Sequence, residues 1–260
     1  MDWLYTFSGF LVGLIVGITG VGGGSLMTPL LVLLFGVAPA TAVGTDLLYA
    51  ALTKLGGSWV HSRNGTVDWK VVRLLAAGSV PAALLSLWVL HALQLDEKQL
   101  RVLITGVLSV ALVLTALSLL LKPWVQKLAQ REDGAVFELH AHHLAGATVT
   151  TGAVLGVLVT LSSVGAGALG MAVLLFLYPR HGTARLVGTD IAHAVPLTLV
   201  AGLGHAALGT VNFGLLAALL LGSLPGIWLG SHLGAGIPER VLRPVLAAML
   251  LLIGGRLLLI

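Results

Sequence analysis

The feature that most constrains this chain is a glycine run inside an apolar stretch, Gly20-Val21-Gly22-Gly23-Gly24-Ser25. Leu, Val and Ile fill residues 10–18 before it and 30–35 after it, so a helix would be interrupted within lipid. Each glycine costs a helix interior about 1 kcal/mol relative to alanine. Unwound backbone is tolerated in hydrocarbon only where protein buries it or where it lines a cavity. The run therefore predicts a binding site inside the membrane, with close helix packing through small residues as the alternative.

The composition places the chain among integral membrane proteins. Hydrophobic residues make up 57% of it and charged residues 9%, whereas soluble domains average roughly 25% charged residues. Apolar segments of about 20 residues predict transmembrane helices, because barrel strands would show weakly alternating segments of about 10. The chain has no cysteine, which excludes disulfides and thiolate metal sites. In a membrane chain the positions of basic residues matter more than the net charge of +4, and no nucleic-acid partner is expected.

A second broken segment and a set of repeated blocks indicate an internal duplication. The second break is Ser162-Ser163-Val164-Gly165-Ala166-Gly167-Ala168-Leu169-Gly170. A shift of 144 residues aligns blocks of the two halves, namely Val43-Gly44-Thr45-Asp46 with Val187-Gly188-Thr189-Asp190, Gly65-Thr66-Val67-Asp68-Trp69 with Gly209-Thr210-Val211-Asn212-Phe213, His61 with His205, and Gly78-Ser79-Val80-Pro81 with Gly222-Ser223-Leu224-Pro225. Each half is one broken segment, 4–36 or 144–178, followed by three spans. The spans are predicted near residues 39–61, 69–91, 99–121, 183–205, 212–234 and 241–259.

Loop charges predict that the halves cross the membrane in opposite directions. The link at 36–40 has no Lys or Arg while its equivalent at 179–185 has two, and the link at 61–73 has three while its equivalent at 206–211 has none. Equivalent loops on opposite sides are expected of inverted repeats, which need an odd number of crossings per half. A broken segment that returns as a hairpin satisfies this. The predicted fold is an all-α polytopic membrane protein with two inverted-topology repeats, each a broken helical hairpin plus three transmembrane helices.

Basic residues also predict the orientation and the division of the chain. With the N-terminus outside, ten Lys and Arg residues lie inside and three outside, as the positive-inside rule favours. The repeats are predicted at 1–121 and 144–260, joined by a cytoplasmic linker at 122–143. The chain is therefore expected to be a multi-pass protein of the cell inner (cytoplasmic) membrane, in contact with the lipid bilayer. A homo-oligomer is left open. Tryptophans near predicted span ends would form an interfacial belt, and they are Trp3, Trp59, Trp69, Trp88 and Trp124.

Helices that start inside the membrane predict a site for an anion. Their first N–H groups lack partners, and the helix dipole adds about half a positive charge. Ser25 is expected to cap the helix after the first break, and the glycines let backbone amides approach a ligand without a Cβ in the way. Two such helix ends facing one cavity would favour an oxyanion. The candidate substrate-binding residues lie at the two breaks and in the repeated Gly-Thr-Asp blocks, and they are Gly22, Gly23, Gly24, Ser25, Thr45, Ser162, Ser163, Gly165, Gly167 and Thr189.

The glycine run, the short helix that it opens as far as Pro29, and the block Val43-Gly44-Thr45 resemble the TauE/SafE family of sulfite exporters. The resemblance covers nearly all of the duplicated chain. It implies an inner-membrane permease for small sulfur oxyanions or organosulfur anions, in a family whose substrates vary.

Asp46 and Asp190 are carboxylates placed inside predicted spans, each after a Gly-Thr pair. Ionisable residues inside membranes are costly and usually functional, which favours a proton relay or a gate. The alternative is a helix N-cap near the interface, because each aspartate lies only about five residues into its span. Since a carboxylate repels an anion, neither is expected to bind the substrate directly.

Lys54 and His193 lie near these carboxylates on the same predicted helices. Lys54 follows Asp46 by eight residues, a displacement of roughly 80° around a helix. It could pair with Asp46, attract the anion or snorkel to the cytoplasmic surface. Its repeat equivalent is Thr198, so this charge breaks the symmetry of the halves. His193 is one turn from Asp190 and could exchange protons with it. Candidates for proton relay or gating are therefore Asp46, Lys54, Asp190 and His193.

The remaining histidines are not expected to take part in the predicted site. His61 and His205 are expected to be interfacial, and the linker histidines His140, His142 and His143 are expected to be solvated rather than to bind metal. No metal, cofactor or catalytic residue is expected.

The alternatives to a transporter are an anion channel and an intramembrane hydrolase with Ser25 as nucleophile. Paired polar features favour a secondary transporter for a small sulfur-containing anion such as sulfite or an organosulfonate, with proton coupling as a further hypothesis.

Overall fold

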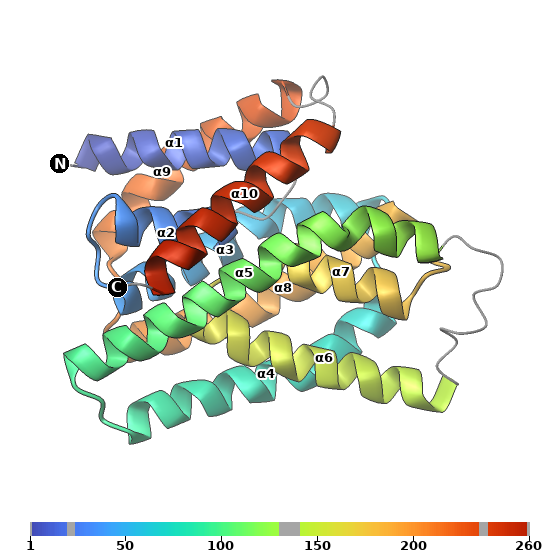
Figure 1. Ribbon diagram of the computed structural model, residues 1–260, viewed down its shortest axis with the longest axis horizontal. Coiled ribbons are helices and arrows are strands. Elements are labelled where there is room, and N and C mark those ends of the chain that lie inside the picture. Colours follow the sequence, from blue (N-terminus) through green and yellow to red (C-terminus); the bar gives the residue numbers. More distant parts are fainter. Residues whose placement is uncertain (1, 20–23, 130–140, 234–238, 259–260) are drawn as a thin grey trace.

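The computed structural model describes residues 2–19, 24–129, 141–233 and 239–258, and these residues form helices and connections with no strand among them. The helices, drawn in Figure 1, are α1 Asp2–Thr19, α2 Gly24–Leu33, α3 Pro39–Arg63, α4 Trp69–Ala92, α5 Glu97–Ala129, α6 Ala141–Ser162, α7 Ala168–Leu177, α8 Thr183–Ala207, α9 Phe213–Leu233 and α10 Glu239–Leu258. The all-helical prediction is confirmed. Each predicted full span coincides with one helix, and each predicted broken segment contains two.

Helix length and surface composition agree with a multi-pass membrane protein. Stretches in α4, α5, α6, α8 and α9 are long and apolar enough to cross a membrane. Helix α5 continues to Ala129 and α6 begins at Ala141, so both extend into the segment 122–143 predicted as a linker. Large apolar side chains are exposed on the surface, as contact with lipid requires, and they include Trp3, Trp59, Trp69, Trp88 and Trp124.

Both broken segments fold back as helical hairpins. The ring of Tyr5, near the start of α1, lies 5.0 Å from the ring of Phe35, just beyond α2. In the second half, Thr148 near the start of α6 hydrogen-bonds to Tyr178 just beyond α7, with 2.7 Å between the two oxygens. The return helices α2 and α7 have 10 residues each, so each is about 15 Å long and covers half of a hydrocarbon core of about 30 Å. Each return helix is therefore too short to cross that core by itself.

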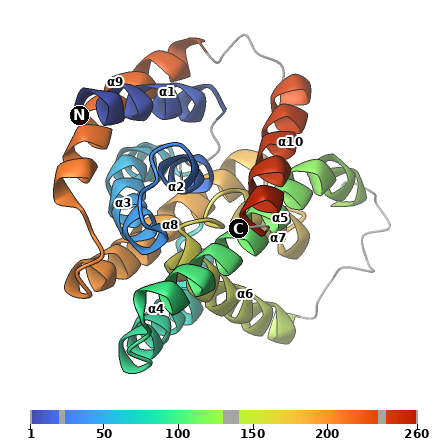
Figure 2. The ribbon, with the colours of Figure 1, turned by 60° about the vertical axis from the view of Figure 1, so that its left-hand side comes forward.

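Helices of one half pack against helices of the other half, and equivalent helices form equivalent pairs. Helices α7 and α8 follow α2 and α3 by 144 residues and have the same lengths. Helix α1 packs on α9 of the other half and its equivalent α6 packs on α4, while α3 packs on α8 and α5 on α10 (Figure 2). Near the start of α3, Thr45 accepts the backbone N–H of Asn212, which lies beyond the end of α8. Near the start of α8, Thr189 likewise accepts the N–H of Asp68, beyond the end of α3. The equivalent helices α3 and α8 therefore run antiparallel, as inverted repeats require, and the sidedness of the loops stays a prediction.

Glycines bring these helix pairs into backbone contact. A Cβ added to Gly222 of α9 would overlap the carbonyl of Thr6 in α1. In the equivalent pair, a Cβ added to Gly78 of α4 would overlap the carbonyl of Val149 in α6. Small residues at such contacts let helices associate closely in lipid. Small-residue packing therefore operates at these helix contacts, which lie away from the two breaks.

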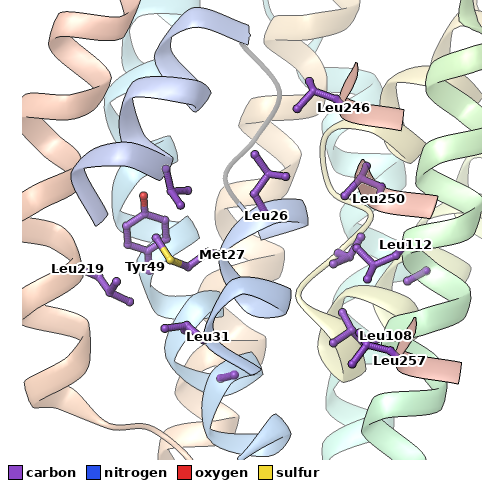
Figure 3. Packing of buried hydrophobic residues seen from close by; sticks show 14 of the residues in the cluster. Leu26, Met27, Leu31, Tyr49, Leu108, Leu112, Leu219, Leu246, Leu250 and Leu257 are labelled. Atoms are coloured by element: carbon purple, nitrogen blue, oxygen red, sulfur yellow. The ribbon is translucent and has the colours of Figure 1, made fainter. Parts of the chain in front are cut away.

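The return helix α2 is enclosed by the main apolar cluster of the protein. Figure 3 shows Leu26, Met27 and Leu31 of α2 between two groups of side chains. The group on one side is Tyr49 of α3 with Leu219 of α9, and the group on the other side comes from α5 and α10 and comprises Leu108, Leu112, Leu246, Leu250 and Leu257. Because apolar side chains cover α2 on both sides, the helix starts within the protein rather than in lipid.

Candidate functional site

The second break is a buried, non-helical turn between α6 and α7. Helix α6 ends at Ser162 and α7 begins at Ala168. Three residues between them have positive φ, namely Ser163 at 59°, Gly165 at 125° and Gly167 at 137°. Gly167 is the N-cap of α7 and has no side chain to bind the first amides of the helix. The N-terminus of α7, with its partial positive charge, is therefore not capped by a side chain.

The two serines of this break have different surroundings. The hydroxyl of Ser162 donates to the carbonyl of Leu158 at 2.5 Å and accepts the backbone N–H of Val164 at 3.1 Å. Ser163 is only 4% exposed, and its Oγ has no hydrogen-bond partner. Ser162 thus hydrogen-bonds at the end of α6, whereas Ser163 Oγ makes no hydrogen bond and lies beside the Asp46 carboxyl group.

Much of the first break lies outside the described residues. This applies to Gly22 and Gly23, and the side chain of Ser25 is not described either. Helix α2 begins at Gly24, directly after the glycine run. The roles of these four residues at an anion site stay predictions.

Asp46 and Asp190 are buried in the interiors of α3 and α8, with 0% and 3% of their surface exposed. The capping alternative is wrong, because the N-caps of the two helices are Ala38 and Gly182. Thr28 of α2 donates a hydrogen bond to Asp46 Oδ2 over 2.5 Å. The Oδ1 atoms of both aspartates have no hydrogen-bond partner. Intramembrane carboxylates that keep an unsatisfied oxygen are expected at functional sites.

Lys54 joins α3 to the second break. Its Nζ donates a hydrogen bond to the backbone carbonyl of Ala166 over 2.8 Å. Ala166 directly precedes the N-cap of α7, so the ammonium points into the break and not to a membrane surface as snorkelling would require. The ammonium acts electrostatically on both Asp46 and Asp190. It forms a direct ion pair with neither of them among the described side chains. Lys54 is therefore a half-buried cation that acts on two carboxyl groups.

Asp190 and His193 face different helices although they lie one turn apart. A Cβ added to Gly170 would overlap Asp190 Oδ1, so this carboxylate lies against the first turn of α7. His193 Nε2 and Ser79 Oγ of α4 share a hydrogen bond of 2.8 Å, and His193 Nδ1 has no partner. No hydrogen bond between Asp190 and His193 is found in the described part of the chain. Direct proton exchange between them therefore needs a bridging water or a change of side-chain rotamer.

Tyr49 is a buried polar residue that sequence reasoning missed. A shift of 144 residues places Tyr49 on His193 and Ser79 on Ser223. Tyr49 lies beside Ser223, and its hydroxyl has no hydrogen-bond partner. The repeat alignment is the signal that could have identified it, because a tyrosine in one half takes the place of the histidine in the other.

The hydroxyls of Thr45 and Thr189 hold the contact between α3 and α8. Each accepts a backbone N–H from the loop beyond the facing helix. Thr189 also donates to the carbonyl of Arg185 over 2.7 Å. Both hydroxyls are therefore engaged within the protein, which favours a packing role over the predicted role in binding the anion.

The histidines at the ends of α3 and α8 form equivalent turns. His61 shares a hydrogen bond of 2.8 Å with Thr66, and His205 shares one of 2.8 Å with Thr210. His205 is buried and its other ring nitrogen is 2.9 Å from the carbonyl of Thr160, so it does not lie on the surface as an interfacial residue would. Of the linker histidines, His140 lies outside the described residues.

Comparison with known proteins identifies the family. The family model described as "Sulfite exporter TauE/SafE" matches residues 5–257. The chain belongs to the TauE/SafE family. It is similar to "Probable membrane transporter protein YjnA" of Bacillus subtilis (strain 168), with 38% identity over 250 residues, 96% of this chain and 97% of the relative. It is also similar to "Probable membrane transporter protein YdhB" of the same organism, with 29% identity over 256 residues, 94% of this chain and 97% of the relative. No solved structure matches.

A second charged cluster of the TauE/SafE protein, also missed from the sequence, joins the loops after α3 and α7. Asp68 Oδ2 accepts hydrogen bonds from Arg185 at 3.0 Å and from His181 at 3.1 Å, and its Oδ1 caps α4. Partial burial favours a higher pKa for Asp68. The hydrogen bonds from His181 and from backbone amides, together with the charge of Arg185, outweigh burial and lower this pKa below its ordinary value. The equivalent residue in the other half is Asn212, so this cluster exists at one end of α3 and α8 only.

A cavity of about 280 Å³ lies at the opposite end of the TauE/SafE protein. Its lining includes Pro39 at the start of α3 and both Glu97 and Arg101 at the start of α5. None of the predicted site residues lines it. The transporter therefore has a hollow beside the start of α3 and an ionic cluster beyond its end.

Proposed function

We propose that this TauE/SafE transporter moves a small sulfur-containing anion, such as sulfite or an organosulfonate, across the cell inner (cytoplasmic) membrane. The family model names sulfite export. The observation that carries the proposal is the buried hydroxyl of Ser163 at the second break, which makes no hydrogen bond and lies beside the Asp46 carboxyl group. This hydroxyl lies just ahead of a helix N-terminus that no side chain caps, and Lys54 brings a positive charge to the same turn. A hydroxyl donor, a helix N-terminus and an ammonium suit an oxyanion.

Proton coupling is the second part of the proposal. Asp190 and His193 are buried one turn apart, and each has a polar atom without a partner. Two titratable groups in this position can hold a proton while the anion crosses. Anion export from a cell that is negative inside is favoured by about 2.3 kcal/mol per charge per 100 mV, so coupling is not required for export. Flux in proteoliposomes should depend on pH, and Asp190→Asn should remove that dependence.

A binding screen on purified protein tests the substrate class. Sulfite, thiosulfate, sulfate, methanesulfonate and a set of carboxylates are titrated into the wild-type protein. Ser163→Ala should weaken binding of the preferred anion by roughly tenfold or more, because a hydrogen bond to a charged group contributes about 1.5–3 kcal/mol. Ser109→Ala is the matched control, since Ser109 is equally buried but bonds only to the Thr105 carbonyl of its own helix.

Outcomes that contradict the proposal are equally specific. If no sulfur-containing anion binds and a carboxylate does, the substrate class is wrong. Unitary currents in planar bilayers would identify a channel in place of a carrier. Hydrolysis of a membrane peptide or lipid reporter that is lost in Ser25→Ala would identify an enzyme.

A further inference from the structure

The two broken hairpins are built alike but differ in charge. Helices α2 and α7 have equal lengths and equivalent positions. Lys54 of α3 points to the break before α7. Its repeat equivalent in α8, Thr198, is buried and bonds to the carbonyl of Ala194 in its own helix. The first half of the chain therefore places the half-buried ammonium of Lys54 at the second hairpin, whereas the second half has a neutral hydroxyl, Thr198, at the equivalent position.

Two positive features meet at the second break. The Lys54 ammonium is 2.8 Å from the Ala166 carbonyl, two residues before α7 begins. The N-terminus of α7 carries partial positive charge and has no side-chain cap. Positive charge gathered in a low-dielectric interior is stabilised only by negative charge close to it. Ser163, 4% exposed and without a hydrogen-bond partner, adds a donor at the same turn.

Among the described residues, the carboxyl groups that act on Lys54 are those of Asp46 and Asp190, and their hydrogen-bond restraints differ. Asp46 is held by the hydroxyl of Thr28. The residue equivalent to Thr28 in α7 is Ala172, which has no hydroxyl. Asp190 Oδ1 has no hydrogen-bond partner and lies against the first turn of α7. Asp190 is thus the carboxylate that occupies the positive end of α7 without being fixed there.

From this asymmetry we infer that the protein has a single anion site, at the second break, where Lys54 supplies the positive charge and Asp190 is the internal carboxylate that the substrate replaces. The inference rests on the proposed function. Lys54 exchanges its hydrogen bond with Ala166 for one with the anion. Ionised Asp190 competes with the anion, and a proton on Asp190 ends the competition. Binding of one monovalent anion is thereby linked to binding of one proton, and the charge of the site is conserved.

The groups around Asp190 are few, which makes the pH dependence interpretable. Helix α3 contributes Lys54 and Asp46, and Asp46 lies beside Ser163 of the same break. His193 lies on α8 itself and is bonded to Ser79 of α4. Helix α7 contributes backbone at its first turn. Helix α6 contacts α8 near the end of α8, where the carbonyl of Thr160 bonds to His205. Variants at Lys54, Asp190 and Asp46 therefore cover the charged groups near the site, apart from His193.

The test measures anion binding to purified protein by calorimetry between about pH 5 and about pH 8. The probe is methanesulfonate, which carries one negative charge throughout this range, because sulfite itself takes up a proton near neutral pH. For the wild type we expect one anion per chain and tighter binding at lower pH. Lys54→Met should weaken binding by at least about tenfold, Lys54→Arg should retain it, and Lys70→Met, at an exposed lysine, is the control.

Substitutions of the two aspartates distinguish this inference from a general effect of negative charge on anion binding. Asp190→Asn should bind the anion at neutral pH as tightly as the wild type does at low pH, without pH dependence. Asp46→Asn removes a carboxylate from the same cluster and should leave the pH dependence in place. Equal effects of the two substitutions, two anions per chain, or binding unchanged in Lys54→Met would each overturn the inference alone. If the wild type bound no anion, the proposed function would fail and the inference with it.

Discussion

The hydrogen bond between Thr28 and Asp46 offers a quantitative test of the buried site. It joins α2 to α3 over 2.5 Å between two fully buried side chains. Thr28→Val keeps the shape of the side chain and removes the donor, so Asp46 Oδ2 is left unsatisfied. We expect the free energy of unfolding to fall by about 1–3 kcal/mol, which is the cost of stranding a buried polar group. Thr198→Val is the control, because that hydroxyl bonds only to carbonyls of its own helix and its loss should be nearly neutral.

A double-mutant cycle measures how much the hydrogen bond between Thr28 and Asp46 contributes to the free energy of unfolding. Thr28→Val, Asp46→Leu and the double variant are unfolded reversibly in mixed detergent micelles and followed by tryptophan fluorescence; leucine is used because the amide oxygen of asparagine would still accept the Thr28 hydroxyl. Interhelical hydrogen bonds in membrane proteins average about 0.6 kcal/mol in such cycles, whereas a bond to an ionised partner contributes about 1.5–3 kcal/mol. The coupling energy therefore reports whether Asp46 is protonated or ionised. If the two substitutions were additive within about 0.3 kcal/mol, the bond would contribute nothing and the reasoning about Asp46 as the restrained carboxylate would be refuted.

Other predictions address packing, topology and the ionic cluster. Gly222→Ala should destabilise the protein by about 1–3 kcal/mol in the same unfolding assay, because the added Cβ overlaps the α1 backbone, while Gly56→Ala, with open space around it, should not. Cysteines introduced at Arg63 and Arg180 in this cysteine-free chain should react with an impermeant reagent from the same side, and labelling from opposite sides would contradict the inverted topology. Asp68 has a lowered pKa in the folded protein, so its stabilisation is present above the ordinary Asp pKa of about 3.9 and is lost as pH falls through the lower folded value. Asp68→Asn should lower stability near neutral pH by about 0.5–1 kcal/mol and remove that acid-dependent loss, as melting temperatures measured against pH will show.

The sequence by itself determined the elements and their order. A helix or a break depends on residues close together in the chain, so apolar runs and glycines are read locally. The spans predicted at 39–61 and 183–205 coincide with α3 and α8 almost to the residue. The second break lies where its serines and glycines predict it. The repeat blocks predicted equivalent positions, among them the aspartates inside α3 and α8. At 122–143, where the sequence predicts a linker, the end of α5 and the start of α6 extend into the segment.

Only the tertiary structure decided which polar groups meet. Lys54 bonds to a carbonyl 112 residues away, and Arg185 reaches Asp68 across 117. The structure also separated Ser163, whose hydroxyl is unpartnered, from Ser162, whose hydroxyl closes α6. The physical reason is that lipid does not distinguish one apolar helix face from another, so hydropathy cannot predict which faces pack together. Glycines allow particular pairs of helices to pack in close backbone contact. This packing brings Lys54 to the Ala166 carbonyl and Arg185 to Asp68.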